Sequence, residues 1–229
     1  MRLYFIRHGQ SANNALWDAT GGDHGRSDDP ELTDIGRQQA ALLSAFLARE
    51  RAPFGITHIY TSLMIRAVET ALAISGALAL PVRVWEDVHE TGGIFLEDDR
   101  GQRIGRPGKA RAHFEATYPT LILPDTLNAH GWWNRAYEDT QARPVRAQRF
   151  VQALLAQHGS TLDRVAIVSH GNFYRYMMAA ILHIPDPDSY YFPMNNGALS
   201  RIDFPERDGE ATLIAYLNRC DYLPRELWT

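Results

Sequence analysis

Short apolar runs alternate with longer amphipathic stretches along this chain. Six runs have the length and the β-branched or aromatic content of strands, and they cover residues 3–7, 58–60, 82–85, 165–169, 199–204 and 212–217. Between them, apolar residues recur at spacings of three and four, as at Leu43, Phe46 and Leu47. This spacing places them on one face of a helix. Similar stripes within residues 63–72, 151–155 and 177–182 predict further core-facing helices.

This alternation predicts an α/β fold. Helices between strands favour a mostly parallel central sheet covered on both faces, which is a three-layer α/β/α sandwich. The last two strand-like runs are joined by a turn-like stretch at residues 205–209, so we expect them to form an antiparallel hairpin at one edge of the sheet.

Two regions do not follow this alternation of strands and helices. Residues 12–31 are polar and rich in Gly and Asp, which predicts a long loop. Residues 90–137 contain many Gly and Pro residues and read as an insertion, with one short helix near residues 109–117 and otherwise loops. Long loops in compact domains usually serve as lids or binding segments.

Length and composition bound the class of protein. The chain has 229 residues, 45% hydrophobic and 22% charged, which predicts a single soluble domain over residues 1–229, with the insertion or lid at about 90–137. The net charge of −4 gives no reason to expect a nucleic-acid or membrane partner. Neither a signal peptide nor a membrane span is recognisable, so a cytoplasmic location is the default expectation. The sequence leaves open whether the chain forms a homodimer.

Metal and cofactor sites have little support in the sequence. The single cysteine, Cys220, excludes an intramolecular disulfide and a multi-cysteine metal site, and it reads as an inert, semi-buried thiol. The nine histidines include no cluster of His-x-x-x-His or Glu-x-x-His pairs with the ligand spacing of a metal site. No G-x-G-x-x-G follows the first strand, which argues against a dinucleotide site.

Chemistry-bearing residues follow the strand-like runs. His8 ends the first run and His170 ends the run at 165–169. Ligands bind at the carboxyl ends of strands in open α/β sheets. If these two strands are neighbours, both imidazoles converge, and Arg7 and Arg66 reach the same point. Such a cationic pocket suits a phosphoryl dianion, because charge-assisted hydrogen bonds are each worth roughly 1.5–3 kcal/mol. The helix that begins after Gly171 adds backbone N–H donors.

Each residue also has an ordinary structural interpretation. Arg66 alone fits a helix salt bridge, and Glu90 alone fits a surface carboxylate. Gln10 and Asn14 fit loop residues that bond the backbone, whereas Thr33 and Ser62 precede periodic runs and are predicted helix N-caps. The functional interpretation is favoured by the joint occurrence of the candidates, in order, at corresponding strand ends.

Four motif blocks carry a resemblance to a known family. They are residues 3–14 (LYFIRHGQSANN), Leu32-Thr33-x-x-Gly36-x-x-Gln39-Ala40, Thr61-Ser62-x-x-x-Arg66-Ala67-x-x-Thr70-Ala71 and residues 168–171 (VSHG). Together they resemble the histidine phosphatase superfamily, also called the phosphoglycerate mutase-like family. The resemblance implies the phosphoglycerate mutase-like fold and a two-step reaction through a phosphohistidine.

The resemblance also implies roles for individual residues. His8 would be the nucleophile, His170 would hydrogen-bond the phosphoryl oxygens, and Asn14 and Gln10 would line the pocket with Gly171. Arg7 and Arg66 disfavour the imidazolium form of His8 and stabilise the charge on the transferred group. We therefore expect no metal and no other cofactor.

The leaving oxygen needs a proton, and Glu90 matches the acidic residue that follows the third strand in this family. A role as general acid requires a protonated carboxyl group near neutral pH, through burial or through the charge of the phosphate. Glu86 and His89 compete for this role. Glu90 is favoured because Gly92-Gly93 follows it closely, as glycines often follow the family's acid.

These features predict an enzyme, a metal-independent phosphomonoesterase of the histidine acid phosphatase type that hydrolyses a small phosphorylated metabolite. The alternative is a cofactor-dependent phosphoglycerate mutase. It is disfavoured because residues 15–29 and 91–98 do not resemble the blocks that mutases carry there. A second alternative is a non-catalytic phosphate-binding module, against which the complete set of histidines, arginines and acid argues.

The substrate is expected to be chosen by the insertion. Trp132 and Trp133 either close over the substrate or anchor the insertion to the body, and the structural role is favoured. Five cations gather nearby, at Arg100, Arg103, Arg106, Lys109 and Arg111. A solvated basic loop is the preferred interpretation, and contact with a second acidic group of the substrate is the alternative.

Overall fold

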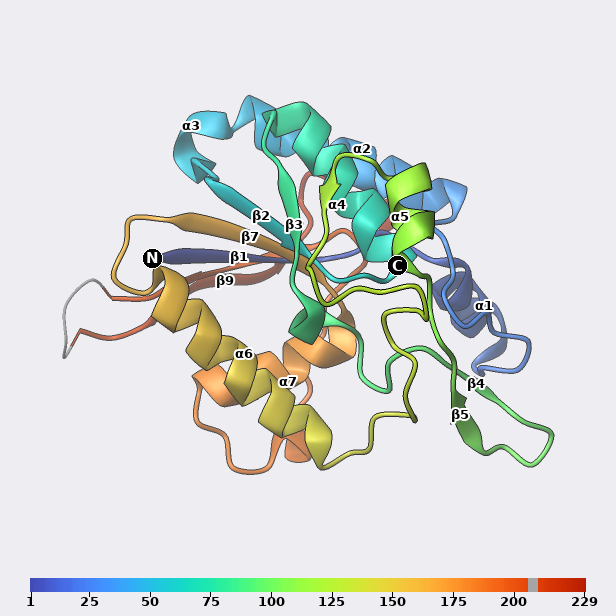
Figure 1. Ribbon diagram of the computed structural model, residues 1–229. Helices are drawn as coiled ribbons and strands as arrows, with labels where there is room; N and C mark the ends of the chain where they lie inside the picture. Colours follow the sequence, from blue (N-terminus) through green and yellow to red (C-terminus); the bar gives the residue numbers. More distant parts are fainter. Residues whose placement is uncertain (206–209) are drawn as a thin grey trace.

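A seven-stranded sheet forms the centre of the computed structural model, which describes residues 1–205 and 210–229 (Figure 1). The strand order is β6-β3-β2-β7-β1-β8-β9. The strands are β1 (Arg2–Arg7), β2 (His58–Thr61), β3 (Val82–Val84), β6 (Leu121–Ile122), β7 (Arg164–Ser169), β8 (Leu199–Asp203) and β9 (Leu213–Arg219). The first five positions in the order pair in parallel, whereas β8 and β9 add an antiparallel edge. The predicted fold class is confirmed.

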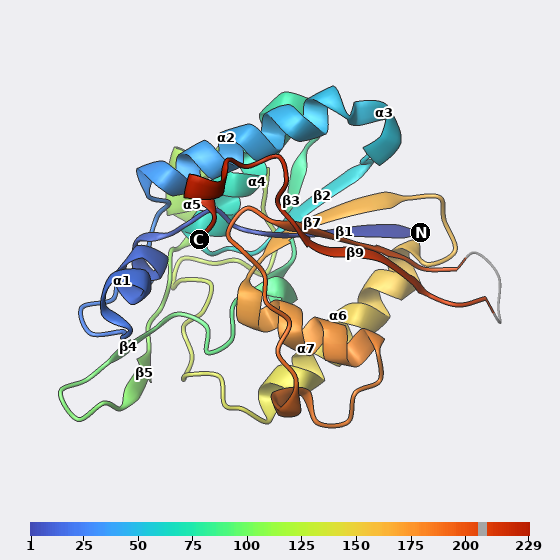
Figure 2. The same ribbon diagram turned by 180° about the vertical axis from the view of Figure 1, so that it is seen from behind.

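Helices cover both faces of the sheet, as Figures 1 and 2 show. One face packs against α2 (Asp34–Arg49) and α4 (Ile65–Leu78), and the other against α6 (Ala142–His158) and α7 (Gly171–Ile181). Successive side chains of β1 point to opposite faces of the sheet, so this strand contributes to the hydrophobic core on each face. Leu3 and Phe5 pack on the side of α6 and α7, whereas Tyr4 and Ile6 pack on the side of α2 and α4. All four side chains are buried, which explains why the strand reads as a continuous apolar run.

The central pairing brings the candidate residues together. Strands β1 and β7 are parallel neighbours, with Arg7 opposite Ser169. His8 and His170, the residues that follow these two, therefore leave the sheet side by side. The expectation that these strands are adjacent is confirmed.

The antiparallel edge is also confirmed, with β8 paired to β1 and β9 to β8. The predicted turn at 205–209 lies almost entirely outside the described residues. Within the described chain, none of the helices combines the length and the apolar character needed to span a membrane.

The prediction of a loop over residues 12–31 is wrong in its first half, which forms α1 (Ala12–Thr20). Ser11 caps this helix, because its side chain accepts the N–H of Asn14, and the Asn14 side chain accepts the N–H of Ser11 in return. This reciprocal arrangement is a capping box formed with asparagine in place of the usual Glu or Gln. The helix has only nine residues and buries none of them, and it lies in a stretch whose second half is rich in Gly and Asp.

The insertion contains more regular structure than the sequence predicted. The short helix is confirmed as α5 (Arg111–Thr117), but β4 (Phe95–Glu97) and β5 (Arg103–Gly105) form a separate antiparallel pair. β6 joins the main sheet by pairing with β3. These strands have only two or three residues, too few to show a hydrophobic period, so tertiary pairing alone defines them. α3 (Arg51–Phe54) is a further short helix.

Candidate active site

The loop after β1 is held by close backbone contact with α2. A Cβ atom on Gly9 would lie 2.4 Å from the carbonyl oxygen of Gly36, and one on Gly36 would lie 2.0 Å from that of Gln10. Thr33 caps α2 as predicted, by accepting the N–H of Gly36. Gln39 then accepts the backbone N–H of Gln10 at 2.7 Å. The second motif block therefore supports the histidine loop, and none of the residues that define it lines the cavity next to His8.

Two contacts fix the orientation of His8. Its Nδ1 lies 2.6 Å from the carbonyl oxygen of Gly9, so Nδ1 carries the proton and donates it. Nε2 then has a free lone pair, which accepts a hydrogen bond from Nε of Arg66 at 3.1 Å. Burial, with the charges of Arg66 and Arg7, lowers the pKa of His8 well below its usual value. The ring is therefore neutral, with the lone pair of Nε2 directed at Arg66.

Arg7 and Arg66 come from different elements. Arg66 lies in the first turn of α4, and its backbone carbonyl accepts the hydroxyl of Thr70, which in turn accepts the N–H of Gly9. Arg7, at the end of β1, donates to the carbonyl of Met194, and its buried Nε has no partner among the described residues. Both arginines are therefore fixed to the same loop as His8, and Arg7 keeps a donor for an anion.

His170 lies against His8, with ring centroids 5.0 Å apart. Its Nε2 is 2.8 Å from Oγ of Ser62, while its buried Nδ1 has no partner in the described chain. Ser62 Oγ also accepts the N–H of Met64. The predicted N-cap role of Ser62 is wrong, because α4 begins three residues later and has no side-chain cap. Ser62 instead orients His170. Burial and the nearby Arg66 and His8 lower the pKa of His170.

Glu90 lies at the amino end of α7. Its Oε1 accepts the N–H groups of Thr91 and Phe173, and its Oε2 accepts that of Asn172 at 3.2 Å. The expectation that this helix end offers its donors freely to phosphate needs correction, because two of them already bind the carboxylate. Gly171 packs against Arg7, since a Cβ there would be 3.4 Å from Nε of Arg7.

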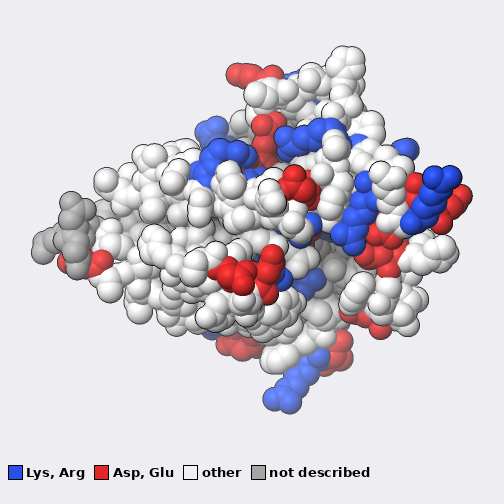
Figure 3. Space-filling view, turned by 90° about the horizontal axis from the view of Figure 1, so that it is seen from below, with Lys and Arg blue, Asp and Glu red and all other residues white. Residues whose placement is uncertain are grey.

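One cavity of about 650 Å³ unites most of the predicted residues. Arg7, His8, Arg66, Glu90 and Asn14 all line it. His170 lies behind His8, and Gln10 is held away from the cavity by the hydroxyl of Thr33, at 2.7 Å from its Oε1. Viewed from below, positive and negative side chains intermingle on one side of the molecule (Figure 3).

The competing acids lie elsewhere. Glu86 accepts the hydroxyl of Thr126 at 2.9 Å. His89 is buried, bonds the carbonyl of Glu90 through Nδ1 and packs against Trp133 with centroids 4.8 Å apart. Neither lines the His8 cavity. Trp133 is itself buried, and Trp132 is half-buried and packs beside it. The anchoring role expected for both tryptophans agrees with this packing.

The sequence interpretation did not include Asn196 and Asp29, which contact the predicted residues. Asn196 donates through Nδ2 to the carbonyl of His8 at 3.0 Å and to Oδ1 of Asn14 at 3.2 Å. Asp29 is buried, accepts the N–H of Ile65 and lies 3.9 Å from Arg66. The Asn195-Asn196-Gly197 turn signal preceding β8 is a sequence feature that could have pointed to Asn196. No local pattern distinguishes Asp29 from Asp28.

Among the described residues, a single group has the composition and spacing of a metal site, namely His58, His158 and Asp163. Both ring nitrogens of His158 already have protein partners, since Nδ1 contacts Asp163 at 2.8 Å and Nε2 contacts the hydroxyl of Tyr60 at 3.1 Å. The group lies at the amino ends of β2 and β7, away from His8. Cys220 is a buried free thiol.

Known proteins share this arrangement of sequence and fold. The chain is 27% identical over 211 residues to a Yersinia pestis protein named "Probable phosphoglycerate mutase GpmB", with 90% of this chain and 86% of the relative covered. A phosphoserine phosphatase structure from Entamoeba histolytica, solved with 3-phosphoglyceric acid, aligns with a TM-score of 0.62 at 19% identity over 97% of this chain and 99% of that one.

A mycobacterial glucosyl-3-phosphoglycerate phosphatase, in complex with VO3, aligns with a TM-score of 0.56 at 23% identity over 88% of this chain and 90% of that one. The family model for the histidine phosphatase superfamily (branch 1) matches residues 3–216, which contain all four motif blocks. The chain belongs to the histidine phosphatase superfamily, branch 1.

Proposed function

We propose that this protein is a phosphomonoester hydrolase that passes the phosphoryl group of a small phosphorylated metabolite through His8. The observation that carries this proposal is the orientation of the His8 ring. Gly9 holds the proton on Nδ1, so the lone pair of Nε2 is available in a buried cavity with two arginines. A purely structural histidine would not need a lone pair kept next to two cations.

In the first step, Nε2 of His8 attacks phosphorus in line with the ester oxygen. The new N–P bond forms as the P–O ester bond breaks, and the leaving oxygen takes a proton from the carboxyl group of Glu90. Arg66 must give up its hydrogen bond to Nε2 and donate to a phosphoryl oxygen instead. Arg7 has a free donor for a second oxygen. Both cations stabilise the charge on the transferred group.

In the second step, water attacks phosphorus and the N–P bond breaks. The carboxylate of Glu90 takes a proton from the water, inorganic phosphate leaves, and His8 regains its neutral form. His170 serves both steps by donating a hydrogen bond to a phosphoryl oxygen from Nδ1, the ring nitrogen without a partner. Ser62 stabilises this tautomer by donating its hydroxyl proton to Nε2. No step calls for a metal ion, so we expect activity to survive EDTA.

The phosphohistidine can be trapped directly. We expect rapid quenching of the enzyme and a ³²P-labelled phosphomonoester in alkaline detergent to leave label on the protein that is stable to alkali and is lost on later treatment with acid. His8→Ala should abolish this label and lower turnover of p-nitrophenyl phosphate by about 10⁴-fold or more. His130→Ala, an exposed histidine in the insertion, is the control and should keep both. Label that survives His8→Ala would refute the assignment.

The named mutase relative makes one competing activity worth measuring. With 3-phosphoglycerate as substrate, we expect release of inorganic phosphate to exceed formation of 2-phosphoglycerate, with and without added 2,3-bisphosphoglycerate. Isomerisation that outpaces phosphate release would make the protein a mutase and overturn the hydrolase proposal while leaving His8 as the nucleophile.

A further inference from the structure

Five residues outside the phosphate-binding centre form a compact arginine–aromatic cluster, made of Arg26, Phe95, Arg103, Tyr137 and Arg143. The rings of Phe95 and Tyr137 meet edge to face with centroids 4.8 Å apart. The Arg26 guanidinium lies 3.9 Å from the centre of Phe95, and those of Arg103 and Arg143 lie 5.1 and 5.8 Å from the centre of Tyr137. All five line the same cavity as His8.

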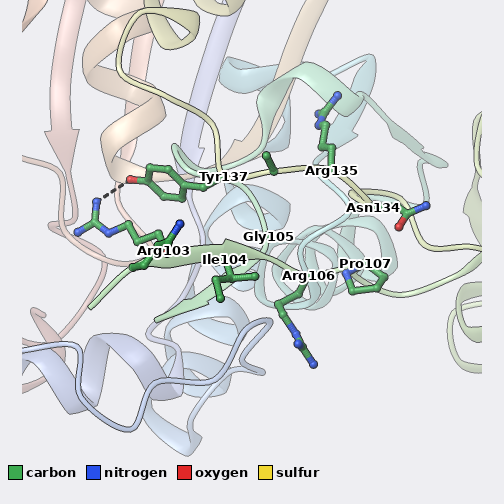
Figure 4. Close-up of a pocket in the computed structure, with 10 residues that line it drawn as sticks. Arg103, Ile104, Gly105, Arg106, Pro107, Asn134, Arg135 and Tyr137 are labelled. Carbon is green, nitrogen blue, oxygen red and sulfur yellow. Dashed lines mark hydrogen bonds between the residues drawn. The ribbon is translucent and has the colours of Figure 1, made fainter. Parts of the chain in front are cut away.

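The cluster joins three parts of the chain that are distant in sequence. Arg26 follows α1, Arg103 belongs to β5, and Arg143 lies in the first turn of α6. The hydroxyl oxygen of Tyr137 accepts hydrogen bonds from Arg103 at 2.7 Å and from Arg143 at 2.8 Å. Figure 4 shows the first of these bonds, with Arg103 and Tyr137 directed toward each other. The guanidinium groups are therefore held in place before any ligand arrives.

The positive charge of this cluster is only partly neutralised. Arg103 pairs with Glu97 at 3.0 Å, and Arg26 lies 3.6 Å from Asp23. Arg143 forms no ion pair within the described part of the chain. In addition, the buried Nε atoms of Arg26 and Arg143 lack hydrogen-bond partners there. These Nε atoms are inaccessible from the cavity, so an anion there would bind the terminal nitrogens of the guanidinium groups and neutralise their charge.

Of the residues that the structure describes, four acids line the cavity, and none of them forms an ion pair with Arg143. Asp188 pairs with Arg175, Asp23 lies beside Arg26, and backbone N–H groups bind the Glu90 carboxylate. Asp18 is the fourth acid of the lining. The faces of Phe95 and Tyr137 are flanked by guanidinium groups, so the cluster offers a ligand charge more than an open apolar surface. A neutral substrate tail would leave the positive charge of these arginines without a counter-charge.

We propose that the substrate carries a second anionic group, a carboxylate or another phosphate, which binds Arg143 together with Arg103 and Arg26 while His8 receives the first phosphoryl group. This inference rests on the proposed hydrolase activity and names the substrate class of that site. Each end of the substrate then meets arginines, and the cavity of about 650 Å³ holds both ends. The enzyme would then prefer doubly anionic substrates, because a substrate without the second charge would form no ion pair with the cluster.

Non-hydrolysable phosphonates test this without knowledge of the natural substrate. Each ω-carboxyalkylphosphonate, with two to five carbons between the groups, is compared with the alkylphosphonate of equal length as an inhibitor of p-nitrophenyl phosphate hydrolysis. An alkane-bisphosphonate series distinguishes a second phosphate from a carboxylate. We expect at least one doubly anionic compound to bind tenfold or more tightly than its singly anionic counterpart.

The variants identify the residue responsible. In Arg143→Gln, whatever activity remains is used to measure the same ratio of inhibition constants, which should fall to within twofold of unity. Arg149→Gln is the matched control, because Arg149 lies on the same helix, pairs with Asp87 and is absent from the His8 cavity. It should keep both the ratio and the basal activity.

A preference absent at every chain length, or one that survives Arg143→Gln, would overturn the second-anion proposal. Failure of the hydrolase proposal has a different signature, since the wild-type protein would then not hydrolyse p-nitrophenyl phosphate at all. In that case, calorimetric titration with the same phosphonates and the same variants decides whether the second anion binds.

Discussion

The loops at the strand ends and the insertion at residues 90–137 both line the His8 cavity, but they are built differently. In the loops, each functional residue lies next to a strand or in the first turn of a helix, so its position follows from regular elements, and some of its contacts are close in sequence. His8 bonds its neighbour Gly9, and the Arg66 backbone accepts Thr70 one helical turn away. In the insertion, Phe95 and Tyr137 are separated by 42 positions and meet only through tertiary packing.

If the protein is the proposed hydrolase, this contrast separates two tasks. The transferred phosphoryl group is the same for any phosphomonoester, and the groups proposed to bind it belong to the rigid sheet edge. The remainder of the substrate differs between phosphomonoesters, and most of the groups proposed to bind it lie on segments that can change without disturbing the core. Changes at the strand ends should therefore affect all substrates equally, whereas changes in the insertion should affect them selectively.

The largest effect is expected from Arg66→Met. Loss of this cation removes a stabilising charge in the transition state, and kcat/KM should fall by about 10³-fold for every phosphomonoester tried. Steady-state hydrolysis of p-nitrophenyl phosphate and a doubly anionic ester measures this. The exposed Arg49→Met is the control. A fall in kcat/KM that differed strongly between substrates would contradict the proposed difference between the two regions.

Gly36→Ala should come next in size. The added Cβ would collide with the carbonyl of Gln10, 2.0 Å away, so either the His8 loop or α2 must move. We expect unfolding to become easier by about 2–4 kcal/mol, with a parallel loss of activity. Gly76→Ala is the matched helical control, because its Cβ meets nothing within 4 Å, and it should stabilise the protein by up to about 1 kcal/mol. The free energies of unfolding of the two variants are measured by urea denaturation. Equal changes in both variants would contradict the close contact between Gly36 and Gln10.

Asp29 gives a prediction for pH. Burial raises its pKa to about 6 from 3.8, despite the opposing effect of Arg66. The folded state therefore holds this proton more tightly than the unfolded state. The resulting stability is complete below pH 3.8 and is lost as pH rises through about 6, by about 2–3 kcal/mol in total. Asp29→Asn cannot ionise, so the free energy of unfolding of the wild type should fall relative to this variant between pH 4.5 and 7.5. A constant difference would exclude a raised pKa.

The smallest effect on stability is expected from Glu97→Gln in the insertion. Its pair with Arg103 is partly exposed, and such pairs contribute about 0–1 kcal/mol. The same change removes a counter-charge from the arginine–aromatic cluster. Thermal unfolding should therefore shift little, while the preference for doubly anionic phosphonates should increase. A decrease in that preference would count against a cationic role for the cluster.

Much of the fold and of the central site could be predicted from the sequence. Residues 3–6 of the first strand are apolar because both faces of the strand are buried there, so the sequence predicts the strand without any information on its neighbours. His8, Arg66 and His170 stand at fixed distances from such strands. Asn196 and Asp29 were not found, since their roles depend on contacts with residues 182 and 36 or more positions away. Ser62 was assigned a cap by its local position, and only the packed structure shows it beside His170.

The sequence by itself determined the central sheet, the paired histidines and arginines, and the family, because buried strands and capped helices leave periodic patterns that need no distant partner. Tertiary structure decided α1, the β4–β5 pair, the position of β6 and the arginine–aromatic cluster. Those elements are short or exposed, so their local preferences are weak. They are stabilised by contacts between distant segments, and no window of the sequence records such contacts.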